Sequence, residues 1–292
     1  MDPAPFIRGA AFPGSSRVPY PRAKRDDRLP QDTWGMACIP SGVRVEWVGQ
    51  GMVELDGAGD SGLTWVDVDD RSIGYLPLVA GVKVVSVEGD IEPASPQPRW
   101  LAYGDSITEG WITSTPASAW PSVVGRVLSL NAINMGYAGA ARGEIVSAEH
   151  IAELEADVIT VAHGTNCWTR TPHTAAMVAD GLRAFLDVVR QGHPDTPIVV
   201  VSPIVRPDAE ATPNRLGATL ADLRRAIEDV ASERVDVDLV PGLELVTPEQ
   251  LPDGIHPGDE GHAAIAAAIA PALEKALPIA LRASAHRSGS HG

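Results

Sequence analysis

A serine that follows an apolar run is the first candidate for chemistry. The segment Tyr103–Gly110 reads YGDSITEG and follows the apolar residues from Trp100 onward. If that run is a strand of a parallel sheet, Ser106 lies at its carboxyl end, where ligands bind in open α/β sheets. A serine hydroxyl is a weak nucleophile and needs an adjacent base. Gly-Asp-Ser is also an ordinary turn signal, so the interpretation depends on what the rest of the chain supplies.

Three further segments place glycine or polar residues directly after apolar runs or just before the last predicted helix. They are Asn134–Gly139 (NMGYAG), Gly164–Asn166 (GTN) and Asp253–His256 (DGIH). The chain contains no GxSxG segment, so it does not carry the nucleophile elbow of the α/β-hydrolases. Each segment alone is a weak signal for a function. The occurrence of all four segments in this order is the specific signal.

The four segments in this order resemble the SGNH (GDSL) family of serine hydrolases, over about residues 98–278. The resemblance implies a flavodoxin-like three-layer α/β/α domain with a parallel sheet. It implies that Ser106 is the nucleophile and that Asp253 and His256 are the acid and the base. It also implies an oxyanion hole made by the backbone N–H groups of Ser106 and Gly139 and the side chain of Asn166.

These assignments agree with the chemistry of acyl transfer. His256 can take the proton of Ser106 and return it to the leaving group, and Asp253 can hold the imidazole in the correct tautomer. One residue departs from the family pattern: the third segment commonly reads GxND, and Cys167 stands in the last position. We expect Cys167 to be a buried thiol that supports the site, with a catalytic thiol as the weaker alternative.

Large or charged side chains near these segments are candidates for substrate binding. Trp111 and Trp168 can offer apolar faces to an acyl or alcohol group, although ordinary packing is an equal alternative. Arg142 and Arg206 can meet an anionic group, although a solvated arginine is the commoner case. His262 lies six residues after His256; we expect it on a helix surface rather than in a metal site.

The elements that must position these residues fall into two regions. We predict an irregular arm over 1–30 and a small antiparallel β-sandwich, jelly-roll-like, over 31–95. A hairpin is expected near Gly49 and Gly51, between apolar residues that alternate with polar ones. The proline-rich stretch 93–98 is a stiff linker. The hydrolase domain follows over 98–280, and 281–292 is a flexible tail.

Within the second region, apolar runs alternate with amphipathic stretches, which predicts a parallel sheet covered by helices on both faces. The clearest expected strand is Ile198–Val201. The clearest expected helices are Ala175–Val189, Leu216–Val230 and Glu260–Leu277, with Pro271 as a kink or break in the last.

Composition excludes several classes of function. The 292 residues carry a formal net charge of −15, which argues against contact with nucleic acid or an anionic membrane. No apolar run approaches a membrane span and no secretory signal is visible, so we expect a cytoplasmic protein. Two distant cysteines predict reduced thiols. No metal, nucleotide or flavin motif is present, so we expect no cofactor; the expected partner is a small ester or acyl donor.

Three functions remain open at this point. The first is hydrolysis of a carboxylic ester of a small metabolite or sugar through an acyl-serine. The second passes the same acyl group to an alcohol, and the third is a non-catalytic binding module. A β domain before an SGNH domain is similar to some carbohydrate esterases and to acyltransferases that modify polyketides. That domain can cap the active site, bind a sugar or stabilise the fold, and we favour capping. Oligomeric state is not readable from the sequence.

Overall fold

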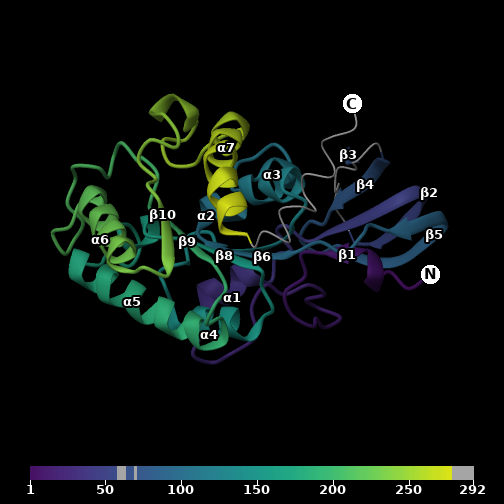
Figure 1. Cartoon of the computed structure of the whole chain (residues 1–292), viewed down its shortest axis with the longest axis horizontal. Helices are drawn as coiled ribbons and strands as arrows, with labels where there is room; N and C mark the ends of the chain where they lie inside the picture. The colour runs from purple at the N-terminus through teal and green to yellow at the C-terminus, as the bar shows by residue number, and fades with distance from the viewer. Residues whose placement is uncertain (58–63, 69–70, 278–292) are drawn as a thin grey trace.

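The computed structural model describes residues 1–57, 64–68 and 71–277, and its centre is a parallel sheet (Figure 1). Five strands form this sheet in the order β10-β9-β8-β6-β7, and every neighbouring pair is parallel. The strands are β6 (Arg99–Gly104), β7 (Asn131–Gly136), β8 (Val158–Ala162), β9 (Ile198–Val201) and β10 (Val237–Val240). The predicted α/β class is therefore confirmed, and the tail expected over 281–292 lies outside the described residues.

Both faces of this sheet are buried, as the near-continuous apolar strands predict. Along β6, Leu101 and Tyr103 belong to one apolar core, whereas Trp100 and Ala102 belong to the other. This alternation follows from the two-residue period of a strand. The first core is completed by α4 (Ile145–Glu153), α5 (Ala175–Gly192) and α6 (Leu220–Glu233), and the second by α3 (Trp120–Val127) and α7 (Asp259–Ala276). Figure 1 shows these helices on opposite sides of the sheet.

Two details of the helices follow from local chemistry. Thr219 caps α6 by accepting the Asp222 N–H, while the Asp222 carboxylate accepts the Thr219 N–H, so two otherwise unpaired donors are satisfied. The predicted break at Pro271 does not occur, because α7 runs through it to Ala276. Ile269 and Leu273 lie on either side of Pro271 and are fully buried against the sheet, which holds this helix in place despite the lost backbone bond.

The N-terminal part contains a separate antiparallel sheet. Its strands are β1 (Ile7–Arg8), β2 (Arg44–Asp56), β3 (Thr64–Val68), β4 (Arg71–Pro77) and β5 (Lys83–Pro93). The first half of β2 pairs with β4 and the second half pairs with β5. Val45, Trp47 and Val87 from different strands share one apolar core. The predicted antiparallel region is confirmed as this five-stranded sheet within the described residues.

The hairpin expected near Gly49 and Gly51 is wrong, because β2 passes through both residues without turning. Gly49 has φ +100°, and a Cβ there would lie 2.2 Å from the Asp90 carbonyl oxygen; at Gly51 it would lie 2.3 Å from that of Glu88. The two glycines therefore allow β5 to approach β2 closely, rather than marking a turn.

The arm predicted over 1–30 is mostly irregular, but much of it is packed against the hydrolase domain. Ala23 and Leu29 belong to the core that contains β6, and Arg22 is fully buried. Helix α1 (Gln31–Ala37), which the sequence did not predict, places Ala37 in the same core. Residues 31–37 therefore pack against the core of the α/β domain, although we assigned them to the antiparallel region.

Candidate active site

The serine predicted as the nucleophile lies at the sharp turn between β6 and a four-residue helix, α2 (Ser106–Glu109). Asp105 caps this helix, because its carboxylate accepts the Ile107 N–H at 3.0 Å. A Cβ on Gly104 would lie 2.1 Å from the Thr108 hydroxyl oxygen, so only glycine lets α2 turn back this tightly. Burial raises the pKa of Asp105 to about 6, and Ser106 itself is buried.

The histidine and aspartate of the last segment reach the serine from the loop before α7. The Ser106 Oγ lies 2.9 Å from His256 Nε2, and His256 Nδ1 lies 2.7 Å from Asp253 Oδ2. The other Asp253 oxygen accepts the backbone N–H groups of Ile255 and His256. Partial burial raises the pKa of Asp253, but these hydrogen bonds outweigh it and leave the pKa below its usual value. Such a series of hydrogen-bonded side chains can carry a proton away from the Ser106 hydroxyl.

Three residues with N–H donors, Ser106, Gly139 and Asn166, line one common cleft. Within the described part of the chain, the backbone N–H groups of Ser106 and Gly139 donate no hydrogen bond to another group. The Asn166 side chain donates one N–H to the Ala141 carbonyl oxygen at 3.1 Å, and an amide carries two such donors. Gly139 has φ +68°. Unused donors next to a nucleophile can stabilise negative charge that develops on a substrate oxygen.

These groups open into a cleft of about 660 Å³. Its lining residues include Ser106, His256, Gly139 and Asn166. Its walls also include Ala138, Thr165 and Ile255 from the three segments, and residues that the sequence did not associate with the site, namely Asp32, Gly35 and Met36 of α1, Thr169 and Arg170. Among the described residues, none from the antiparallel sheet lines this cleft, so α1 occupies the place that we expected the β domain to take.

The candidate substrate-binding residues have different positions. Trp111 lies on the cleft wall, is 48% exposed, and its ring centroid is 6.1 Å from that of His256. Trp168 is not on that wall, because its indole N–H donates to Thr212 and Arg206 covers its ring. Arg142 is not on it either, because it pairs with Asp32 and Glu144.

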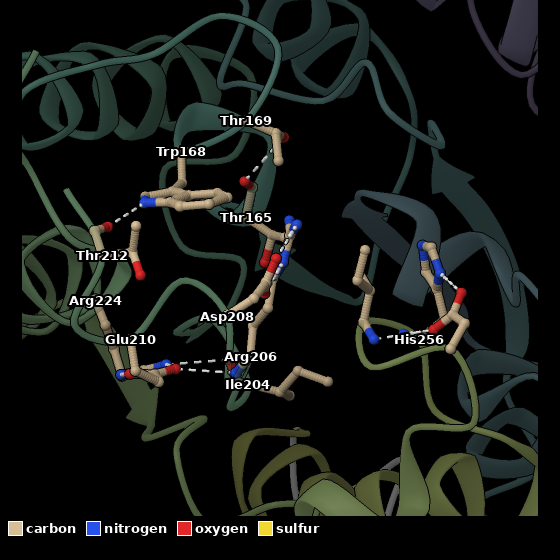
Figure 2. A network of polar contacts seen from close by, with 12 residues as sticks. Thr165, Trp168, Thr169, Ile204, Arg206, Asp208, Glu210, Thr212, Arg224 and His256 are labelled. Atoms are coloured by element: carbon tan, nitrogen blue, oxygen red, sulfur yellow. Dashed lines mark hydrogen bonds and ion pairs between the residues drawn. The ribbon is translucent and has the colours of Figure 1, made fainter. Parts of the chain in front are cut away.

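A second network orders the loop after β9 and brings Arg206 to the cleft (Figure 2). The Arg206 guanidinium donates two hydrogen bonds to Asp208 and lies 4.9 Å from the centre of the Trp168 ring. Glu210 accepts the Arg206 backbone N–H and also pairs with Arg224. The charge of Arg206 is therefore compensated within the loop, and its side chain acts as part of the wall.

A buried ion pair connects the N-terminal arm to this site. Arg22 donates to Glu109, the last residue of α2, at 2.8 Å, and the pair is 0% and 7% exposed. Glu109 also accepts the Ala138 N–H at 2.7 Å, directly before Gly139. Arg22 in turn donates to the carbonyl oxygen of Gly136. The arm, the serine helix and the segment before Gly139 are thus held by one carboxylate–guanidinium pair.

Three further titratable residues near the site are buried. Burial raises the pKa of the Cys167 thiol to about 12, which agrees with the expected neutral, structural thiol. Burial lowers the pKa of His163 to about 4, and neither ring nitrogen has a hydrogen-bond partner in the described residues. His262 was expected on a helix surface, which is wrong: it is fully buried and its Nδ1 accepts the Trp120 N–H. No group of three potential metal ligands occurs among the described residues.

A family model for the GDSL-like lipase/acylhydrolase family matches residues 102–264. The chain belongs to this family. The matched range contains the serine turn, both loops with unused N–H donors and the Asp253–His256 loop. The resemblance inferred from the four segments is therefore confirmed, and the protein is of the esterase or acyltransferase type. A search of curated proteins returns no match.

Solved structures with a similar fold include both enzyme types. A salicylyl-acyltransferase, SsfX3, from a tetracycline biosynthetic pathway has a TM-score of 0.74 at 22% identity, over 94% of this chain and 95% of that one. A GDSL-like lipase structure from Bacteroides ovatus has a TM-score of 0.73 at 20% identity, over 92% and 94%. A family two carbohydrate esterase from Corynascus thermopiles has 0.57 at 14%, over 80% and 93%. At these identities the similarity shows the fold alone.

In the described residues, no helix is long and apolar enough to cross a membrane.

Proposed function

We propose that this protein hydrolyses a carboxylic ester of a small acylated metabolite or sugar through an acyl-serine intermediate. The observation that carries the proposal is the hydrogen-bonded series from Ser106 through His256 to Asp253. It opens into a cleft whose wall also holds N–H donors that have no other partner among the described residues. A serine hydroxyl, a base that touches it and a carboxylate that orients the base are the parts that acyl transfer requires.

The proposed reaction has two steps. In the first, the Ser106 oxygen attacks the ester carbonyl carbon while His256 Nε2 takes the hydroxyl proton. The N–H groups of Ser106, Gly139 and Asn166 stabilise the oxyanion. The intermediate then collapses, the alkoxy group leaves with the proton from His256, and the acyl group stays on the serine. In the second step a water attacks the acyl-serine, His256 takes its proton and returns it to the serine oxygen, and the carboxylic acid leaves.

Solvent access favours water as the acceptor. Ser106 and His256 both line the cleft of about 660 Å³, so water in the cleft has access to an acyl group on the serine and to the base beside it. An enzyme that transfers acyl groups to an alcohol has to keep water from the acyl-serine. Acyl transfer remains the second candidate, because the fold is similar to that of the salicylyl-acyltransferase over nearly the whole chain, the N-terminal part included.

The test is an assay with p-nitrophenyl esters from acetate to octanoate. Ser106→Ala should abolish turnover, and Ser16→Ala, at an exposed serine far along the chain from the site, should not. Asn166→Ala should lower kcat by about 10²–10³-fold, which is the usual effect of losing one oxyanion donor. A burst of one equivalent followed by slow turnover that alcohols accelerate would identify an acyltransferase. Full activity in Ser106→Ala would refute the proposal. If the native protein neither turned over any of the esters nor was labelled at Ser106 by a fluorophosphonate, the results would favour a binding module.

A further inference from the structure

Arg170 occupies a distinctive position in the cleft. It lies in the loop after Asn166 and lines the same cleft as Ser106. If a Cβ is placed on Gly139, the Cζ, Nε and Nη1 atoms of Arg170 are all 3.6–3.7 Å from it. Three atoms of a planar group at nearly the same distance mean that the guanidinium lies flat over Gly139. The positive charge is therefore next to the backbone N–H donor of the proposed oxyanion hole.

Arg170 has no counter-charge among the residues that the structure describes. The side chain is exposed and makes no hydrogen bond or ion pair with any residue that the structure describes. The neighbouring arginines differ: Arg206 pairs with Asp208, and Arg142 pairs with Asp32, the carboxylate on the cleft wall. In a chain with 38 acidic and 23 basic residues, a guanidinium without a partner among the described residues is a local positive charge in the cleft.

We propose that Arg170 binds a carboxylate group of the substrate, beside the ester that Ser106 attacks. This inference rests on the proposed function and names the substrate class for the same site. A guanidinium presents parallel N–H donors that match the two oxygens of a carboxylate. One uncompensated cation matches a monoanion, whereas a phosphate dianion would call for further donors. The carboxylate belongs either to the acyl part or to the alcohol part of the ester, and the experiment separates these two cases.

The test compares esters that differ by one carboxylate. For the acyl part the pair is p-nitrophenyl valerate and the p-nitrophenyl monoester of glutaric acid. For the alcohol part it is phenyl acetate and 4-carboxyphenyl acetate. The quantity measured is the ratio of kcat/KM for the anionic ester to that for the neutral ester, so that the neutral ester is an internal reference. We expect the native protein to prefer the anionic ester in one of the two pairs.

In that pair, Arg170→Gln should lower the ratio by about 10–100-fold, the usual effect of losing a hydrogen bond to a charged group. Arg170→Glu should lower it further because the charge is reversed, and Arg170→Lys should restore part of it. Salt should reduce the preference of the native protein, because the site is open to solvent. The matched control is Arg225→Gln, at an exposed arginine of α6 outside the cleft, and it should leave the ratio at the native value.

Two results would overturn the proposal: a native protein with no preference for the anionic ester in either pair, or an equal ratio in Arg170→Gln and the native protein. Failure of the proposed function is a separate outcome, because it means that neutral esters too show no Ser106-dependent turnover. In that case, the role of Arg170 is tested by measuring, with calorimetry, the binding of glutarate and of benzoate to the Ser106→Ala protein. Binding that Arg170→Gln removes supports the proposal, and binding that is absent or unaffected by Arg170→Gln refutes it.

Discussion

Replacing Glu109 by glutamine should destabilise the protein much more than its small chemical change indicates. Glu109 accepts from Arg22 at 2.8 Å, from the Ser41 hydroxyl at 3.0 Å and from the Ala138 N–H at 2.7 Å. All three contacts are donors. A glutamine has one oxygen and one NH₂ group, so its NH₂ must face a donor on one side, and the fully buried Arg22 loses its counter-charge.

The magnitude follows from this geometry. Breaking a buried ion pair by removing one charge costs about 3–5 kcal/mol. Arg22 also donates to carbonyl oxygens, including those of Ile39 and Met36 at 2.6 Å each, and these contacts remain in the variant. We therefore expect a loss near the lower limit, about 3 kcal/mol. The matched control is Glu233→Gln, whose pair with Arg183 is 57% and 43% exposed; such exposed pairs contribute about 0–1 kcal/mol.

The assay is urea unfolding at pH 7, followed by tryptophan fluorescence. With a slope of about 3 kcal/mol per molar urea, Glu109→Gln should move the midpoint down by about 1 M, and Glu233→Gln by no more than about a third of that. Because Glu109 also orients Ala138 beside Gly139, kcat should fall while the Arg170-dependent substrate preference persists. A midpoint shift for Glu109→Gln as small as that for Glu233→Gln would show that the reasoning on this buried pair is wrong.

Two other perturbations test the remaining physical arguments. The free energy of unfolding should fall as the pH drops from about 6.5 to about 4. In this range the unfolded chain protonates the imidazole of His163, whereas the buried ring of the folded protein, with its pKa of about 4, stays neutral. The difference of about 2.5 pKa units corresponds to about 3 kcal/mol of stability. His163→Leu should remove that part of the pH dependence in urea unfolding at several pH values, and an unchanged slope would contradict the argument. Gly35→Leu should narrow the cleft, since a Cβ at this helical position meets nothing within 4 Å and points to open space. We expect kcat/KM for octanoate esters to fall by at least about tenfold relative to acetate esters, because the leucine side chain blocks the space for a long acyl group and its apolar contacts are lost. An equal effect on both chain lengths would place Gly35 away from the acyl group.

Local sequence was sufficient for much of the α/β domain. The strands around Leu101, Ile133, Ile159 and Val200 are apolar on both faces, and that pattern predicts a buried parallel sheet wherever the helices lie. The residues proposed for chemistry could be found for a related reason. Ser106, Gly139 and Asn166 each follow the end of a strand, and parallel strands bring their carboxyl ends to one edge of the sheet. The chain order of these segments was enough to identify the family.

The predictions for two glycines and one histidine were wrong, because the role of each residue depends on neighbours that are distant in the sequence. Gly49 and Gly51 look like a turn in the sequence, but they permit the close approach of a strand about 40 residues away. His262 has a helical position that the sequence cannot distinguish from a surface one, and packing against Trp120 buries it. In both cases the decisive contact is made by a segment whose location no local pattern encodes.

The same limit applies to the shape of the cleft. The sequence by itself determined which residues are candidates for catalysis, because that information lies in residue type and in position after a strand. Only the tertiary structure decided that α1 forms a wall, that Trp168 and Arg142 are occupied elsewhere, and that Arg170 lines the cleft with no partner in the described part of the chain. An ion pair or a cleft wall requires two segments to meet across many residues, such as Arg22 and Glu109, and their meeting depends on how the whole core packs.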